Sequence, residues 1–299
     1  MKIKSSAGLA VKIALFYCTL AGFCQSIHAQ TEMQFRLVRN TVIVVPLMAG
    51  GEGPFDFVVD TGADTTIVDP SLADKLTLST MTRIQQTTLA GSQAASVSRI
   101  ASLGSGEVQV KNLPVLVQDL AELHKVDPQI QGIAGQDFLS HFNYLLDYQK
   151  HTIRFELADE IRDTIEGDRV HMEVVGNKMM VASEARSYRD AKLLLRLDSG
   201  TNSVVVMRTG SQTLDLLAHQ YGIAATSGGQ VGMHVGRLDQ LKVGSQCFKD
   251  IAVALSALDS GEQYGDGLLP TLLFHVLYVN NRESFVVFNP KARKNKRNE

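Results

Sequence analysis

FDFVVDTGADTTIV (residues 55–68) and KLLLRLDSGTNSVVV (residues 192–206) are the two stretches that decide the fold of this chain. In each, an apolar run ends at an aspartate, a hydroxyl residue and a glycine follow, and β-branched residues resume. This pattern predicts a sharp loop between two buried strands, with Asp60 or Asp198 at its start. Two carboxyl groups held together in an apolar site cannot both ionise, so they share a proton. The two stretches therefore point to a site made of paired carboxylates.

The segments that follow the two aspartates come in the same order, which indicates an internal repeat. Each half continues with a strand, a helix, a hairpin-rich stretch and an apolar element, QGIAGQDFLSHF at 131–142 and DGLLPTLLFHVL at 266–277. Asp60 and Asp198 are 138 residues apart, about the length of one small domain. One half of the chain is therefore interpreted as a diverged copy of the other.

With these motifs the chain resembles the pepsin/retropepsin-like aspartic peptidases, as a two-lobed member whose lobes each resemble a retropepsin unit. In that family each lobe supplies one aspartate from a D-[ST]-G loop, and a pair of apolar residues plus glycine passes beside it. Ile133-Ala134-Gly135 matches this second element, whereas Leu268-Leu269-Pro270 matches it in part, because proline lacks the backbone donor. The resemblance covers roughly residues 35–290. It implies an all-β, bilobal acid-protease fold of two β-barrel lobes with a few short helices.

The resemblance also implies roles for the loop residues. Asp60 and Asp198 are the expected catalytic pair, in which the ionised carboxyl deprotonates a water and the protonated one hydrogen-bonds the peptide carbonyl. Which of them is protonated stays open, because the pair titrates as a unit. The residues expected to support the pair are Thr61, Gly62, Ser199 and Gly200, and those expected to bind substrate are Ala63, Asp64, Thr201 and Asn202. The alternative for Asp64 is a loop acid satisfied by nearby backbone amides.

Each half has a polar, glycine-bearing stretch before its closing element, TTLAGSQAASVSR at 87–99 and TSGGQVGMHVG at 226–236. In the family, a β-hairpin flap from such a region covers the substrate, and glycine suits its tip or hinge. An ordinary surface hairpin is the alternative. Neither stretch contains the tyrosine of pepsin flaps, so no side chain receives a role here.

Local patterns predict a hairpin over residues 41–59 that delivers Asp60 to the end of its second strand. A short helix is expected from Asp69-Pro70 to Leu76, because aspartate can cap the free amides and proline suits the first turn. A second helix is expected from residue 209 or 211 through Leu217 to Tyr221.

The chain is expected to divide into four segments: a signal peptide at 1–29, a first lobe at 30–160, a second lobe at 161–290 and a basic tail at 291–299. The first segment carries lysines, an apolar run and a polar end, which is typical of a cleaved secretory signal. The lobe boundary is placed in residues 157–168, which are charged and show no obvious core face. We therefore expect an exported protein, periplasmic or secreted, without stable membrane insertion after cleavage. An uncleaved anchor or a lipid attachment is the alternative.

Composition and motifs limit the kinds of disulfide, nucleic-acid partner, metal and cofactor that we expect. Two of the three cysteines would leave with the signal, so Cys247 would remain as a free thiol, expected to be buried. The net charge of −2 gives no sign of a nucleic-acid partner. The eight histidines show no zinc-binding spacing, and nucleotide and serine-nucleophile motifs are missing, so we expect no metal and no cofactor.

These observations predict an exported aspartic endopeptidase that acts on a peptide or protein substrate as a monomer, because both acids come from one chain. A non-catalytic peptide-binding protein of the same fold is the alternative, suggested by Pro270 and the missing flap tyrosine. A peptidase that acts through homodimers of its first lobe is a third possibility, against which the intact Asp198-Ser199-Gly200 argues.

Overall fold

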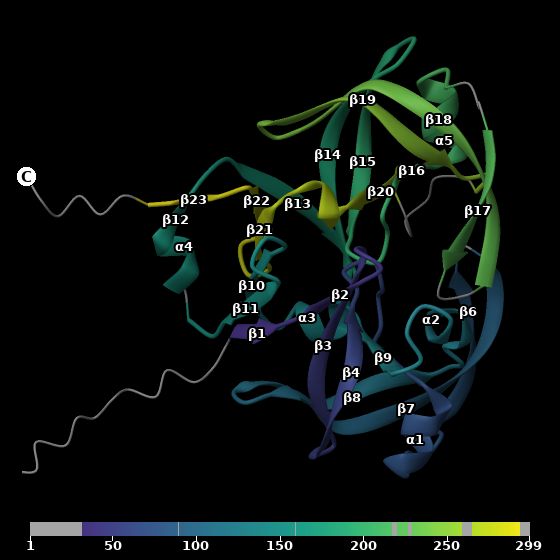
Figure 1. Ribbon diagram of the computed structural model, residues 1–299, viewed down its shortest axis with the longest axis vertical. Helices are drawn as coiled ribbons and strands as arrows, with labels where there is room; N and C mark the ends of the chain where they lie inside the picture. The colour runs from purple at the N-terminus through teal and green to yellow at the C-terminus, as the bar shows by residue number, and fades with distance from the viewer. Residues whose placement is uncertain are drawn as a thin grey trace, which may run out of the picture.

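The computed structural model describes residues 32–293 except 89, 159, 217–219, 227–228 and 259–264 (Figure 1). The expected signal peptide and the end of the basic tail lie outside these residues. The elements of the first half are β1 (Glu32–Gln34), β2 (Arg36–Val38), β3 (Val42–Ala49), β4 (Glu52–Val59), β5 (Ile67–Val68), α1 (Pro70–Lys75), β6 (Thr82–Thr88), β7 (Gly91–Ser105), β8 (Val108–Val117), α2 (Ala121–His124), β9 (Ile130–Ala134), α3 (Gln136–Leu139), β10 (Asn143–Asp147) and β11 (Thr152–Glu156).

The second half repeats this composition of many strands and few short helices. Its elements are α4 (Glu160–Thr164), β12 (Ile165–Glu166), β13 (Arg169–Val175), β14 (Lys178–Arg186), β15 (Asp190–Asp198), β16 (Val204–Val206), α5 (Arg208–Thr213), β17 (Gln220–Thr226), β18 (Gly229–Val243), β19 (Gln246–Leu255), β20 (Gly267–Pro270), the 3₁₀ turn η1 (Thr271–Leu273), β21 (Val276–Asn280), β22 (Phe285–Phe288) and β23 (Lys291–Ala292).

Each half closes its strands into a ring of the same strand order. The first ring runs β3-β4-β9-β5-β8-β7 and closes through β3 and β7; the second runs β14-β15-β20-β16-β19-β18 and closes through β14 and β18. In both rings the strand that ends before a D-[ST]-G loop, β4 or β15, pairs in parallel with the later apolar element, β9 or β20. The predicted all-β fold of two β-barrel lobes is confirmed, and the internal repeat explains the matching order.

One sheet, which also contains the second ring, holds strands from both halves of the chain. Strands β1, β11 and β10 of the first half continue into β21, β22 and β13 of the second, and then into β14 of the second ring. The strands at the junction are antiparallel, with Tyr144 of β10 opposite Val279 of β21 and Asp147 opposite Val276. Figure 1 shows these strands between the two rings. The halves are therefore connected by backbone hydrogen bonds as well as by packing.

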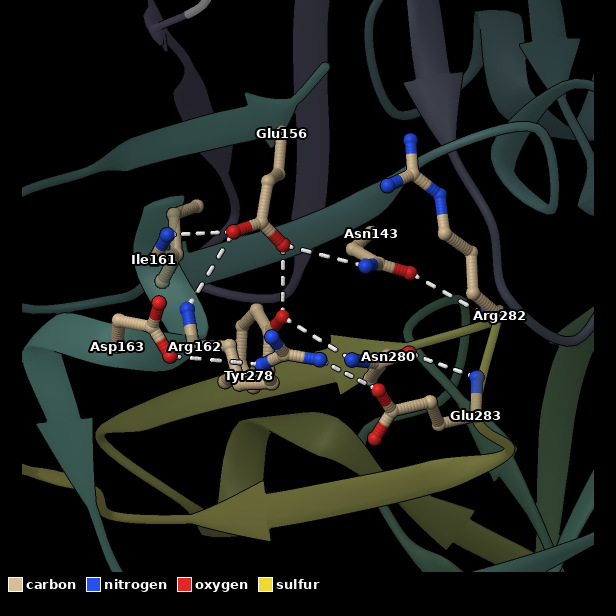
Figure 2. A network of polar contacts seen from close by, with 9 residues as sticks. All are labelled: Asn143, Glu156, Ile161, Arg162, Asp163, Tyr278, Asn280, Arg282 and Glu283. Atoms are coloured by element: carbon tan, nitrogen blue, oxygen red, sulfur yellow. Dashed lines mark hydrogen bonds and ion pairs between the residues drawn. The ribbon is translucent and has the colours of Figure 1, made fainter. Parts of the chain in front are cut away.

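A buried carboxylate strengthens this junction (Figure 2). Glu156, at the end of β11, is 3% exposed and accepts hydrogen bonds from the Tyr278 hydroxyl at 2.7 Å and the Asn143 amide at 3.2 Å. Its other oxygen accepts from the backbone amides of Ile161 and Arg162 at the start of α4. Because a buried carboxylate is costly without such partners, the network fixes the segment that leads from the first half into the second.

The local predictions near Asp60 are confirmed. The hairpin expected over 41–59 is β3–β4. The Asp69 side chain caps α1 by accepting a hydrogen bond from the Ser71 amide at 2.9 Å, and Pro70 occupies the first turn. These features depend on neighbouring residues alone, which is why the sequence predicts them well.

Three other local predictions are wrong. The helix expected to reach Tyr221 is α5, which already ends at Thr213. Tyr221 instead lies in β17, because pairing with β18 overrides the helical spacing of the apolar residues. Leu217 lies outside the described residues. The 157–168 segment has a core face after all, because Ile161 is buried against Tyr278 and Phe285. Cys247 is exposed, because its position in β19, opposite Lys242, points away from the core.

The start of the expected basic tail is ordered as a strand, since β23 pairs with β12. Within the described part of the chain, none of the helices is long and apolar enough to cross a membrane.

Candidate active site

The ends of β4 and β15 deliver Asp60 and Asp198 to the junction of the two rings. The strands reach this point because Phe57, Val58 and Val59 before Asp60, and Leu195 and Leu197 before Asp198, are buried. Each loop then turns on its own aspartate: the Gly62 amide donates to the Asp60 carboxylate at 2.8 Å, and the Gly200 amide donates to Asp198 at 2.7 Å. The two loops therefore have the same internal geometry.

Reciprocal hydrogen bonds lock the two loops together. The Thr61 hydroxyl accepts from the Ser199 amide at 2.9 Å and donates to the Leu197 carbonyl at 3.1 Å. The Ser199 hydroxyl accepts from the Thr61 amide at 2.9 Å and donates to the Val59 carbonyl at 2.8 Å. Thr61 and Ser199 are 1% and 2% exposed, so water does not compete for these groups. Two loops that are 138 residues apart in the sequence are therefore in direct contact.

The glycines let each loop lie against the acid of the other. A Cβ atom on Gly62 would stand 2.3 Å from Cγ of Asp198, and one on Gly200 would stand 2.7 Å from Oδ2 of Asp60. No side chain fits at these distances, so glycine is required by the close approach rather than by backbone conformation. The two carboxyl groups thereby lie close enough to influence each other's pKa.

The environment of the pair favours a retained proton. Burial raises the pKa of Asp60, against the opposing effects of the Gly62 amide and the positive charge of Arg196. Burial, and then the charge of Asp60, raise the pKa of Asp198 to about 7. Because two such carboxyls titrate together, the pair binds one proton up to near-neutral pH.

Asp64, expected to bind substrate, lies in a group of charges contributed by the second half. Its carboxylate contacts the Arg196 guanidinium at 2.5 Å and the Lys178 ammonium at 3.1 Å, and its carbonyl accepts from the Asn177 amide at 2.9 Å. Its side chain is 35% exposed. The alternative of an acid satisfied by local amides is wrong, because its partners come from β14, β15 and the turn before β14.

The remaining residues expected to bind substrate lie beside the pair. Ala63 and Thr201 are half-buried, and Asn202, the counterpart of Asp64, is exposed. The Ala63 carbonyl accepts from the Gln136 amide at 2.8 Å, so this residue also holds α3 against the loop. Their contact with a substrate stays a prediction.

Arg196 is the residue that the sequence analysis missed. It stands two positions before Asp198 in an otherwise apolar run and is 1% exposed. A charged residue inside LLLRLD, where the matching run before Asp60 is FDFVVD, was the available signal.

Pro270 takes the place opposite Asp198 that Gly135 takes opposite Asp60. In the first half, the Gly135 amide donates to the Thr66 hydroxyl at 3.2 Å, and a Cβ atom there would lie 2.8 Å from the Thr65 backbone. In the second half, Pro270 is paired in register with Asp198 and continues into η1. The parallel strand pairing survives the substitution, while the donor to a neighbouring hydroxyl is lost.

Both glycine-bearing stretches form β-hairpins. The β6–β7 hairpin and the β17–β18 hairpin lie on the same side of the molecule (Figure 1). Two of their residues lie close together, because a Cβ atom on Gly229 would be 3.6 Å from Cβ of Ala90. The expected hairpins are confirmed, and their role as flaps stays a prediction.

Residues 45–138 match the family model described as aspartyl protease. The match supports an aspartic-type protease. It covers β4, the Asp60 loop, the β6–β7 hairpin and Gly135, and it ends before the second half. No curated protein matches the chain significantly.

Proposed function

We propose that this protein is an exported aspartic endopeptidase that hydrolyses peptide bonds with a water activated by Asp60 and Asp198. The observation that carries the proposal is the reciprocal pair of hydroxyl-to-amide hydrogen bonds between Thr61 and Ser199, which presses two carboxyls into one buried site. A pair of coincidental strand-end turns would have no reason to interlock in this way. The family match over the first half agrees with this chemistry.

In the proposed reaction, the ionised carboxyl takes a proton from the water as its oxygen attacks the peptide carbonyl. The protonated carboxyl donates to the carbonyl oxygen, so that a neutral tetrahedral diol forms. The diol breaks down when its C–N bond cleaves: the leaving nitrogen takes a proton from one carboxyl of the pair, and one diol hydroxyl gives its proton to the other carboxyl as the new carboxylic acid forms. The raised pKa of the buried pair suits both tasks, because it supplies an acid and a base in one site.

The other residues would serve this reaction by holding the pair and the substrate. Thr61, Gly62, Ser199 and Gly200 would fix the carboxyls, and the exposed part of Asp64 and its counterpart Asn202 would face the substrate backbone. The β6–β7 and β17–β18 hairpins would cover the bound peptide as flaps. Both acids belong to one chain, so the proposed enzyme works as a monomer, and the N-terminal segment would direct it to the periplasm or the medium.

The test is incubation of the exported protein with a diverse peptide mixture at several pH values, with mass spectrometry of the products. We expect cleavage that a statine-type peptide inhibits and that chelators leave unchanged. Asp60→Asn and Asp198→Asn should each abolish cleavage in a protein that stays folded.

Three results would contradict the proposal. Peptide binding without any cleavage would favour the non-catalytic alternative. Near-normal turnover by Asp198→Asn, or a loss of specific activity on dilution, would indicate a site shared between chains. Inactivation by a chelator, reversed by zinc, would exclude the aspartic mechanism.

A further inference from the structure

Arg196 is a buried charge in an otherwise apolar stretch of β15. It is among the largest fully buried side chains, and it lies within β15 between Met180 of β14 and Leu268 of β20. A guanidinium in such surroundings costs several kcal/mol to desolvate, and an apolar residue of similar size is often as stable or more so. The position therefore calls for an explanation beyond stability.

Arg196 interacts with two sets of carboxylates. It makes the 2.5 Å ion pair with Asp64, whose second oxygen is 3.1 Å from Lys178. Arg196 and Asp198 are also two positions apart in β15, so their side chains share one face of the strand, and the positive charge of Arg196 lowers the pKa of both Asp60 and Asp198. Lys178 and Met180 lie on the same face of β14, and Met180 is the cross-strand neighbour of Arg196. The guanidinium is therefore paired with Asp64, which also contacts Lys178, and acts electrostatically on the Asp60–Asp198 pair.

We propose that Arg196 is a positioning residue whose buried charge keeps one carboxyl of the Asp60–Asp198 pair ionised, and that Asp64 sets how much of this charge the pair experiences. The inference rests on the proposed function for its catalytic meaning, but the electrostatic effect exists whether or not peptides are cleaved. The inference also gives Asp64 a role in the site, because its partly exposed carboxylate neutralises part of the positive charge of Arg196.

Other groups near the pair do not replace this charge. Tyr148, from the turn after β10, interacts with Asp198 and has its own pKa raised by burial, so it stays neutral; its hydroxyl contacts the Thr271 hydroxyl at 2.6 Å. The backbone amides of Gly62, Ala63, Gly200 and Thr201 stabilise negative charge but carry none of their own. The positive charge of Arg196 acts on both carboxyls of the pair, and Asp64 and Lys178 are linked to it through their ion pairs.

This arrangement predicts shifts of opposite sign. Arg196→Gln removes a positive charge, so the pair should keep its protons to higher pH, and both limbs of a bell-shaped activity profile should move upward. Asp64→Asn leaves the positive charge uncompensated, so the same limbs should move downward. An opposite charge near a carboxyl shifts its pKa by about 1–3 units. Because Asp64 already neutralises part of the Arg196 charge, we expect a shift on the order of one pH unit for Arg196→Gln and a smaller one for Asp64→Asn.

The experiment uses the full chain labelled with ¹³C at aspartate carboxyl carbons, titrated by NMR in wild type, Arg196→Gln and Asp64→Asn. Signals of the pair are assigned with Asp60→Asn and Asp198→Asn. Arg196→Lys keeps the charge and is the matched control, and Lys178→Gln should give a small upward shift because it frees Asp64 to neutralise Arg196. Where peptides are cleaved, kcat/KM against pH provides a second readout.

Unchanged titration of the pair in both folded variants would overturn the inference, as would shifts of the same sign. If Arg196→Gln does not fold, the downward shift in Asp64→Asn and the upward shift in Lys178→Gln still test it. A wild-type protein that cleaves no peptide would refute the proposed function, yet its NMR titration would still show whether Arg196 controls the charge of the pair.

Discussion

Removing the Ser199 hydroxyl tests how strongly the two halves are locked. Ser199→Ala deletes two buried hydrogen bonds, from the Thr61 amide and to the Val59 carbonyl, and leaves both backbone groups without their partner. An unsatisfied buried group costs about 1–3 kcal/mol, so the expected destabilisation from two such groups is about 2–6 kcal/mol. For a chain of this size, 1 kcal/mol lowers the melting temperature by about 2–4 °C, which predicts a fall of roughly 4–24 °C.

Thermal unfolding followed by calorimetry measures this effect, and the chain offers its own control. The equivalent position in the first loop carries threonine, so Thr61→Ser keeps the hydroxyl and its hydrogen bonds and should cost less than Thr61→Ala. The reasoning is refuted if Ser199→Ala melts like the wild type. It is equally refuted if Thr61→Ser and Thr61→Ala are destabilised alike, because the loss would then come from the methyl group.

Two further predictions concern the carboxyl pair and its surroundings. The pKa of Asp198 is raised from 3.8 to about 7, so the folded protein keeps a proton that the unfolded chain has lost. The free energy of unfolding should therefore fall as pH rises from about 4 to about 7. Asp198→Asn should weaken this pH dependence, which urea titrations at several pH values measure. Gly62→Ala would force a Cβ atom against Asp198 and should cost about 1–3 kcal/mol through overpacking. Gly222→Ala, which meets open space, should leave the melting temperature within about 1 °C of wild type; equal effects of the two alanines would contradict the close approach of the loops.

The features that sequence could predict are those encoded locally or repeated. Asp69-Pro70 specifies its helix through its own side chain and ring, and the two D-[ST]-G loops identify each other by their matching contexts. The spacing of Tyr221 from Leu217 predicts a helix, whereas its place in a strand is determined by pairing with His234 of β18. The ion pair between Asp64 and Arg196 spans 132 residues, and no local pattern specifies such a contact.

The junction of β10 with β21 allows the two halves to differ. In an assembly of two identical chains, every substitution appears on both sides of the two-fold axis, so an arginine beside the pair would come with a second one. Here the position that matches Arg196 is Val58, and the position that matches Pro270 is Gly135. Because β10 and β21 belong to one chain, a single positive charge can stand next to two carboxyls, and one aspartate can be given surroundings that the other lacks.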